Sequence, residues 1–134
     1  MSIKRTPLIT TIIPVFNRAS MLRRSVDSVL AQTYRHIELI IVDDGSEDET
    51  ARVADELAMA HPEIIRVIHK ENGGPGLARE AGRQQARGDY IQYLDSDDWL
   101  LPNKFADQIE VLNENPQADI IYGVTQLVDE HGTI

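Results

Sequence analysis

The chain contains no cysteine, which excludes a disulfide scaffold, a thiolate metal site and a cysteine nucleophile. No apolar run approaches the ~20 residues that a membrane-spanning helix needs, and residues 1–7 lack the apolar core of a signal peptide. Basic residues are also few, with 13 Lys and Arg against 22 Asp and Glu and a net charge of −9. This balance argues against nucleic acid as a partner, because phosphate binding depends on clustered Lys and Arg. These absences predict a cytoplasmic domain, which in a longer protein would lie free or at the inner face of the membrane.

Several nucleotide-binding and metal-binding motifs are missing as well. There is no GxxxxGK[ST] phosphate loop, and the first apolar segment is not followed by the glycine fingerprint of a dinucleotide-binding fold. The acidic segment that begins at Asp95 is not an EF-hand loop, because Leu100 stands where that loop needs glycine and Ala106 where it needs glutamate. Residues 1–134 are enough to bury a core and show no linker or repeat, so we expect one domain or part of one.

Apolar and amphipathic segments alternate along the chain. Short apolar runs, several of them β-branched, predict strands over residues 8–15, 38–42, 64–68, 90–94 and 119–123, and a further strand over 125–128 is left open. Apolar residues at helical spacing predict helices over residues 21–32, 46–60, 75–87 and 102–114. Ser46 and Glu49 have the spacing of a capping box that opens the second helix. The alternation predicts an α/β fold with three layers, α/β/α, around a mostly parallel sheet.

Three of the expected strands end in segments whose residues could contact a ligand. The segments are Pro14-Val15-Phe16-Asn17, Asp43-Asp44-Gly45-Ser46 and Asp95-Ser96-Asp97-Asp98. In parallel sheets, ligands bind beyond the carboxyl ends of the strands, where the strand order reverses. If the first strand is central and the crossovers are right-handed, these three ends lie side by side. That coincidence favours a ligand site.

Three carboxylates, those of Asp95, Asp97 and Asp98, stand within four residues. Acids this close raise one another's pKa unless a cation or a donor compensates. Their oxygens suit a hard cation such as Mg²⁺ or Mn²⁺ that is shared with a phosphate ligand. The alternative is an acidic turn before a helix, with Ser96 or Asp97 as the cap.

A phospho-receiver domain shares some of these features, since it also pairs acids after one strand with an aspartate that ends a later strand. Here those residues would be Asp43, Asp44 and Asp95. In receivers, however, the acidic pair ends the first strand, and a later strand ends in a lysine. A full strand and helix precede Asp43, and no lysine follows Lys104. The receiver domain is therefore the distant alternative.

Seven short blocks stand out in the sequence: PVFNR at 14–18, SVLAQTY at 28–34, ELIIVDDGS at 38–46, ENGG at 71–74, AREAG at 78–82, ARGDYI at 86–91 and LDSDD at 94–98. Their order and spacing resemble the N-terminal half of a family 2 glycosyltransferase, from about residue 8 to about residue 117. The resemblance implies the GT-A fold, a nucleotide-diphosphate sugar donor and a divalent metal, Mn²⁺ or Mg²⁺. It also implies inverting transfer of the sugar to a glycan, lipid or polysaccharide acceptor. UDP is the expected nucleotide because the family uses it most.

The resemblance assigns the nucleotide base to the first two strand ends. Phe16 would lie against the base, where an aromatic face stacks readily; the alternative is a phenylalanine of the core. Pro14 and Asn17 would belong to the same nucleotide-sugar site. Asp44 would accept a hydrogen bond from the ring N–H of the base.

The diphosphate would lie between the glycine-led helix and the acidic segment. Gly74 would let the backbone approach the ligand closely, and Arg79 would reach the base or the diphosphate with its guanidinium fork. Asp95-Ser96-Asp97 matches the DxD motif of the family. Asp97 would then coordinate the metal, while Asp95 and Ser96 orient the ribose or a metal-bound water.

Some polar residues are expected to stabilise the fold or to lie at the surface without contacting a ligand. Asp43 and Asp98 would hold their turns. The histidines are scattered without ligand spacing and predict surface or loop positions: His36, His61, His69 and His131.

In this family the catalytic base lies well downstream of the DxD motif, so no catalytic residue is assigned within this chain. Asp129 and Glu130 lie too early to match that base. We therefore expect residues 1–134 to be the nucleotide-sugar-binding part, without the acceptor-binding half, and to bind donor without transferring sugar. The alternative is a non-catalytic nucleotide-binding module.

Overall fold

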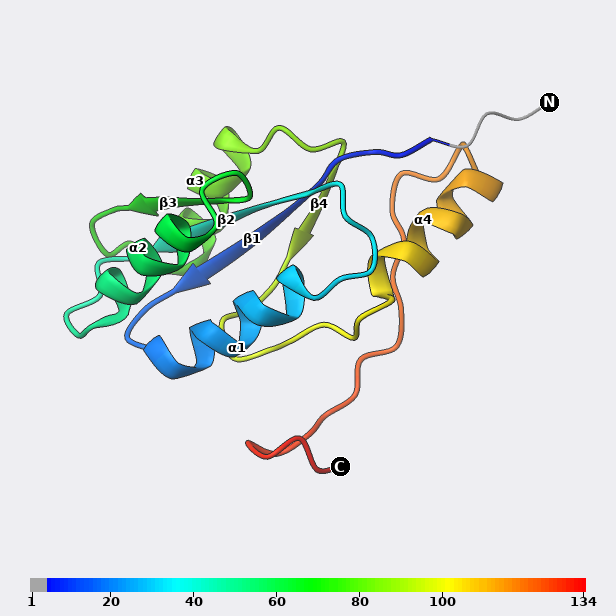
Figure 1. Cartoon of the computed structure of the whole chain (residues 1–134). Coiled ribbons are helices and arrows are strands. Elements are labelled where there is room, and N and C mark those ends of the chain that lie inside the picture. The colour runs from blue at the N-terminus through cyan, green and yellow to red at the C-terminus, as the bar shows by residue number, and fades with distance from the viewer. Residues whose placement is uncertain (1–4) are drawn as a thin grey trace.

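The computed structural model of the chain describes residues 5–134; residues 1–4, which form part of the segment examined for a signal peptide, lie outside the described residues. Strands and helices alternate along the chain (Figure 1). The strands are β1 (Ile9–Val15), β2 (Ile37–Asp43), β3 (Ile65–His69) and β4 (Tyr90–Tyr93). The helices are α1 (Ala19–Leu30), α2 (Thr50–Ala60), α3 (Pro75–Gln85) and α4 (Lys104–Glu114).

The sheet is parallel throughout, with the strand order β3-β2-β1-β4. β1 is therefore an inner strand, which meets the condition for the three strand ends to lie side by side, and the strand order reverses between β1 and β4. Register pairs Val15 with Asp43 and Ile12 with Tyr93, so the carboxyl ends of the three predicted strands meet at one edge. In Figure 1 this edge lies on the left-hand side.

Helices cover both faces of the sheet, which confirms the three-layer prediction. Successive side chains of a strand point to opposite faces, and the core divides accordingly. Ile13 belongs to the cluster that holds the buried side chains of α1, α2 and α4. Ile12 and Ile40 pack with Ala78 of α3 on the other face. α3 approaches the sheet closely at Gly82, where an added Cβ would lie 2.6 Å from a methyl carbon of Ile12.

The predicted strands over residues 119–123 and 125–128 do not form. This stretch has no strand, and Ile120, Tyr122 and Val124 are exposed. A strand needs a neighbour for its backbone N–H and C=O groups, and within residues 5–134 the sheet ends at β4. Figure 1 shows this part of the chain, in orange and red, running away from the layered body.

The capping box at Ser46 is also wrong. α2 begins at Thr50, and the Asp48 carboxylate accepts from the Thr50 N–H at 2.9 Å. Ser46 instead accepts a hydrogen bond from the N–H of Asn17 at 3.0 Å, which links the ends of β1 and β2. The other strands and helices begin and end close to their predicted bounds. None of the helices in the described part of the chain is long and apolar enough to cross a membrane.

Candidate functional site

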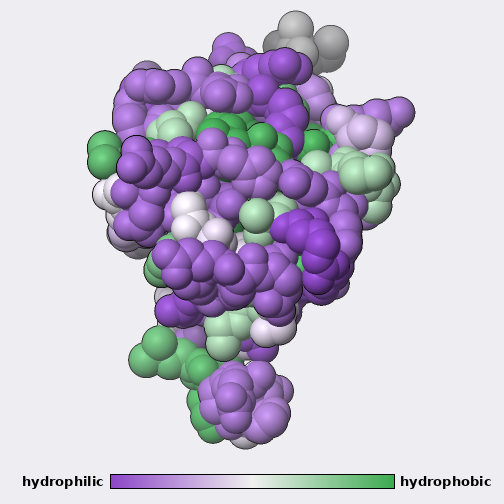
Figure 2. All heavy atoms as spheres, turned by 90° about the vertical axis from the view of Figure 1, so that its left-hand side faces the viewer, coloured by the Kyte–Doolittle hydropathy of each residue, from purple (hydrophilic) through white to green (hydrophobic). Residues whose placement is uncertain are grey.

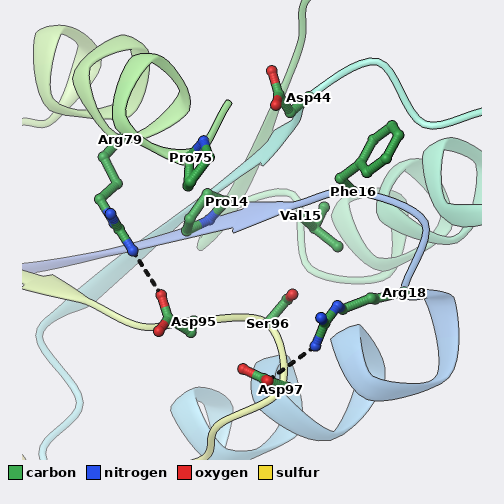
Figure 3. Close-up of a pocket in the computed structure, with 10 residues that line it drawn as sticks. All are labelled: Pro14, Val15, Phe16, Arg18, Asp44, Pro75, Arg79, Asp95, Ser96 and Asp97. Carbon is green, nitrogen blue, oxygen red and sulfur yellow. Dashed lines mark hydrogen bonds and ion pairs between the residues drawn. The ribbon is translucent and has the colours of Figure 1, made fainter. Parts of the chain in front are cut away.

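A cleft of about 370 Å³ opens where the carboxyl ends of β1, β2 and β4 meet. It is lined by Pro14, Val15, Phe16, Arg18, Asp44, Pro75, Arg79, Asp95, Ser96 and Asp97 (Figure 3). All three predicted strand ends and the start of α3 thus contribute to one hollow. Figure 2 views the molecule from this end, and the surface there is mainly hydrophilic with small apolar patches. Such a surface suits a polar ligand with one apolar part.

The acidic segment forms a tight turn, in which the Asp98 N–H donates to the Asp95 carbonyl at 3.0 Å. Carboxylate oxygens of Asp95, Asp97 and Asp98 lie within 4.8 Å of one another. Burial, and then the charges of Asp97 and Asp95, raise the pKa of Asp98. Asp98 therefore contributes a carboxylate to the cluster, in addition to the backbone hydrogen bond that closes the turn. A compact set of carboxylate oxygens fits a hard divalent cation.

Two arginines meet the acids from opposite sides of the cleft (Figure 3). Arg18, at the start of α1, donates to Asp97 at 2.9 Å, and Arg79 of α3 donates to Asp95 at 2.9 Å. These four side chains are between 38% and 54% exposed, so water screens both pairs and each stabilises the fold by at most about 1 kcal/mol. Both guanidinium groups are available to an anionic ligand at little cost. Arg18 was not predicted; its only sequence signal was its place in the PVFNR block.

Phe16 lies at the rim of the cleft with 43% of its surface exposed, so it is not a core phenylalanine. Pro14 lines the cleft beside it. Asn17 does not line the cleft: its side-chain oxygen accepts from the Glu47 N–H at 2.9 Å, and it holds the loop after β1. In Figure 3, Phe16 and Asp44 lie on one side of the cleft, and Asp95 and Asp97 on the other.

Asp44 is only 4% exposed, and its carboxylate accepts hydrogen bonds from other residues of the chain. One oxygen accepts from the Lys70 ammonium at 3.0 Å and from the Gly73 N–H at 2.9 Å. The other accepts from the Gly74 N–H at 2.9 Å and, more distantly, from the Asn72 amide at 3.4 Å. Burial alone would raise the pKa of Asp44, but these hydrogen bonds outweigh burial and hold the pKa below its ordinary value.

The structure places Gly74 beside Asp44, and its predicted approach to a ligand stays a prediction. Gly74 has φ +94° and precedes α3, but it contacts Asp44 and does not line the cleft. Lys70 is the partner that the sequence did not reveal, because nothing local connects it with β2.

A second set of polar side chains, Asp43, His69 and Asp55, lies next to Asp44 at the ends of β2 and β3. Asp43 accepts from the Ser46 N–H at 3.1 Å, which confirms its expected place in the turn. The same carboxylate faces Nδ1 of His69 at 2.9 Å, and Asp55 of α2 faces Nε2 at 2.7 Å. The hydrogen bond with Asp43, followed by that with Asp55, raises the pKa of His69. His69 is exposed, as expected of a surface histidine, but it also joins the ends of β2 and β3 to α2.

With this geometry in view, the family can be identified. The model for Glycosyl transferase family 2 matches residues 10–132. The chain belongs to glycosyl transferase family 2. It is 46% identical over 127 residues to an uncharacterized glycosyltransferase of Rickettsia bellii, covering 94% of this chain and 18% of that protein. It is 37% identical over 118 residues to glycosyltransferase GlyA of Streptococcus pneumoniae, covering 86% of this chain and 16% of GlyA. The chain thus spans less than a fifth of either family 2 relative.

Solved structures confirm the predicted GT-A fold. A mannosyltransferase from Pyrobaculum calidifontis, in complex with GDP-Man and Mn²⁺, superposes with a TM-score of 0.73 at 25% identity, covering 79% of this chain and 32% of that one. TarS 1-349 from S. aureus, in complex with UDP-GlcNAc, gives a TM-score of 0.72 at 25% identity, covering 79% and 31%. The matched part is therefore about a third of each solved chain.

Proposed function

We propose that this chain is the nucleotide-sugar-binding part of a family 2 glycosyltransferase and binds a nucleotide-diphosphate sugar together with a divalent cation in the cleft. The observation that carries the proposal is the convergence of Phe16, the acidic turn and two arginines at the point where the strand order reverses. The complexes of structural neighbours with UDP-GlcNAc and GDP-Man support this ligand class. UDP is the nucleotide that we propose to test first.

The base would lie on the side of the cleft that holds Phe16 and Asp44. The exposed ring of Phe16 offers a stacking face, with Pro14 beside it. Asp44 would accept from a ring N–H of the base. Its contact with Asn72 is the longest of its four, so we expect this contact to give way first.

The diphosphate would lie on the side that holds the acids. Asp97 would hold Mn²⁺ or Mg²⁺, and Asp95 and Ser96 of the proposed DxD motif would orient the ribose. When bound, the cation would neutralise charge on the nucleoside diphosphate that leaves. Arg18 and Arg79 exchange exposed carboxylates for phosphate oxygens, which match the guanidinium fork equally well.

Transfer is proposed to invert the anomeric carbon. The acceptor hydroxyl attacks that carbon, the nucleoside diphosphate leaves, and a carboxylate base takes the hydroxyl proton. We assign no such base within residues 5–134. The chain alone is therefore expected to bind the donor without transferring sugar; turnover by the chain alone would contradict this assignment.

Calorimetric titration with UDP, GDP and dTDP, each with and without Mn²⁺, tests the proposal. We expect at least one nucleotide to bind more tightly with the metal, and Asp97→Ala to remove that dependence. Asp107→Ala is the matched control, because it removes an exposed acid on α4 away from the cleft. If no nucleotide binds in a metal-dependent way, the proposed function is wrong. If Asp97→Ala keeps the metal dependence of the wild type, the metal assignment is wrong.

A further inference from the structure

Ser25 lies in the middle of α1 and is completely buried, although its side chain is polar. Its hydroxyl oxygen lies 2.5 Å from the carbonyl oxygen of Asp98, 2.8 Å from that of Ser96 and 3.5 Å from that of Asp95. All three carbonyls belong to the turn that carries the acid cluster. A hydroxyl has one proton, so Ser25 shares it among carbonyls that converge on one point of α1.

Ser25 is the first of three polar residues, two in α1 and Gln32 just after its end, that form hydrogen bonds with the segment from the acid turn to the start of α4. Ser28 accepts from the Leu100 N–H at 3.0 Å. Gln32 donates to the Leu101 carbonyl at 2.7 Å and accepts from the Phe105 N–H at 3.1 Å. Ser25 and Ser28 lie on one face of α1, and Gln32 follows two residues after the helix ends. Together they supply hydrogen-bond partners to backbone groups that are not paired in the sheet. Of these three side chains, only that of Ser25 contacts the acid turn.

Repulsion between the carboxylates of the acid turn destabilises its compact conformation. Within the turn, the backbone bond from Asp98 to Asp95 resists opening. From outside it, Ser25 draws the carbonyls toward α1. The carbonyl oxygens of the turn face α1, and the side chains of Asp95 and Asp97 line the cleft.

We infer that Ser25 is a positioning residue, which holds the acid turn in the conformation that gathers the carboxylates of Asp95, Asp97 and Asp98 and presents Asp97 to the cation. This inference rests on the proposed function, since it concerns the same metal site. Ser25 touches neither the cation nor the nucleotide. Its effect should therefore appear in metal-dependent binding and be small in binding without metal.

The test compares Ser25→Ala with Ser28→Ala, which removes a hydroxyl from the same helix face beyond the acid turn. Titrations use UDP with and without Mn²⁺, and thermal unfolding records the stability of each variant. We expect Ser25→Ala to weaken Mn²⁺-dependent UDP binding about 5- to 30-fold, the range expected when a buried carbonyl loses its donor. Metal-free UDP binding should change less than about twofold in both variants, and Ser28→Ala should keep the metal-dependent affinity of the wild type. Ser25→Cys retains a weak donor and should recover part of the loss.

Amide hydrogen exchange at Asp98, followed by NMR, measures how often the turn opens and needs no ligand. We expect faster exchange in Ser25→Ala and unchanged exchange in Ser28→Ala. Equal losses of metal-dependent affinity in the two alanine variants would overturn the inference, as would unchanged exchange and affinity in Ser25→Ala. Wild-type protein that binds none of UDP, GDP and dTDP in a Mn²⁺-dependent way would instead refute the proposed function, and the exchange rates would still decide whether Ser25 holds the turn. If Ser25→Ala does not fold, Ser25→Cys provides both measurements.

Discussion

Replacing Asp44 by asparagine tests how strongly one carboxylate joins β2 to the glycine loop before α3. The two side chains have nearly the same shape, so the substitution leaves no cavity. In the wild type, each carboxylate oxygen accepts from a glycine N–H, and one of them also accepts from Lys70. An asparagine must turn its NH₂ group toward one of these donors. At least one backbone N–H then loses its acceptor, and Lys70 loses its charged partner.

The magnitude follows from burial. Removing one partner of a fully buried ion pair costs about 3–5 kcal/mol. The Lys70 side chain is 22% exposed and keeps part of its hydration, and asparagine keeps one acceptor oxygen. We therefore expect the free energy of unfolding to fall by about 2–3 kcal/mol. With an m-value of about 1.5 kcal/mol/M, the urea midpoint falls by about 1.5 M.

Urea unfolding followed by circular dichroism measures this loss, with Glu71→Gln as the control. Glu71 is exposed, and its substitution changes the net charge equally; we expect its effect to stay within about 0.5 kcal/mol. Because the pKa of Asp44 is lowered, its contribution is complete above the unfolded pKa of ~3.9 and is lost as the pH falls through the folded pKa. The gap between wild type and Asp44→Asn should therefore narrow in acid. A gap below about 0.5 kcal/mol at pH 7, or one that does not narrow, would refute this reasoning.

Two further predictions concern packing and pH. Gly82→Ala should lower the free energy of unfolding by about 1–2 kcal/mol and Tm by about 5 °C in calorimetry, because the new Cβ meets Ile12, although alanine favours the helix. Gly76→Ala adds a Cβ on the same helix with nothing within 4 Å, and an equal loss there would show that contact with Ile12 is not the cause. His69 has a raised pKa, so its stabilisation is complete below the unfolded pKa of ~6.5 and is lost as the pH rises through the folded pKa. The urea midpoint of the wild type should therefore fall as the pH rises from about 6.5 through the folded pKa of His69. The midpoint of His69→Gln should depend less on pH over the same range. An equal pH dependence in the two proteins would show that His69 is not the group responsible.

The local apolar pattern was sufficient to predict most of the strands and helices. The continuous β-branched run of β1 predicts a strand buried on both faces, and the apolar stripe of α1 predicts a helix buried on one face. The same local pattern over residues 119–123 led to a wrong strand. A buried strand and an unpaired apolar segment share one pattern, and the pattern carries no information about a neighbouring strand.

The acid turn was predicted from the sequence, and the convergence of three strand ends followed from right-handed crossovers once the first strand was taken as central. The partners of these residues were not predicted. Ser46 has the spacing of a helix cap but bonds to Asn17, and Ser25 bonds to a turn some seventy residues further along the chain. A hydroxyl or a carboxylate bonds to whichever donor or acceptor the packed layers bring near, and local sequence does not encode that distance. The sequence by itself therefore determined the layers and the chemistry at their edge. Only the tertiary structure decided which groups hold the acids of the turn in place, since those contacts exist only once α1 is packed against the sheet.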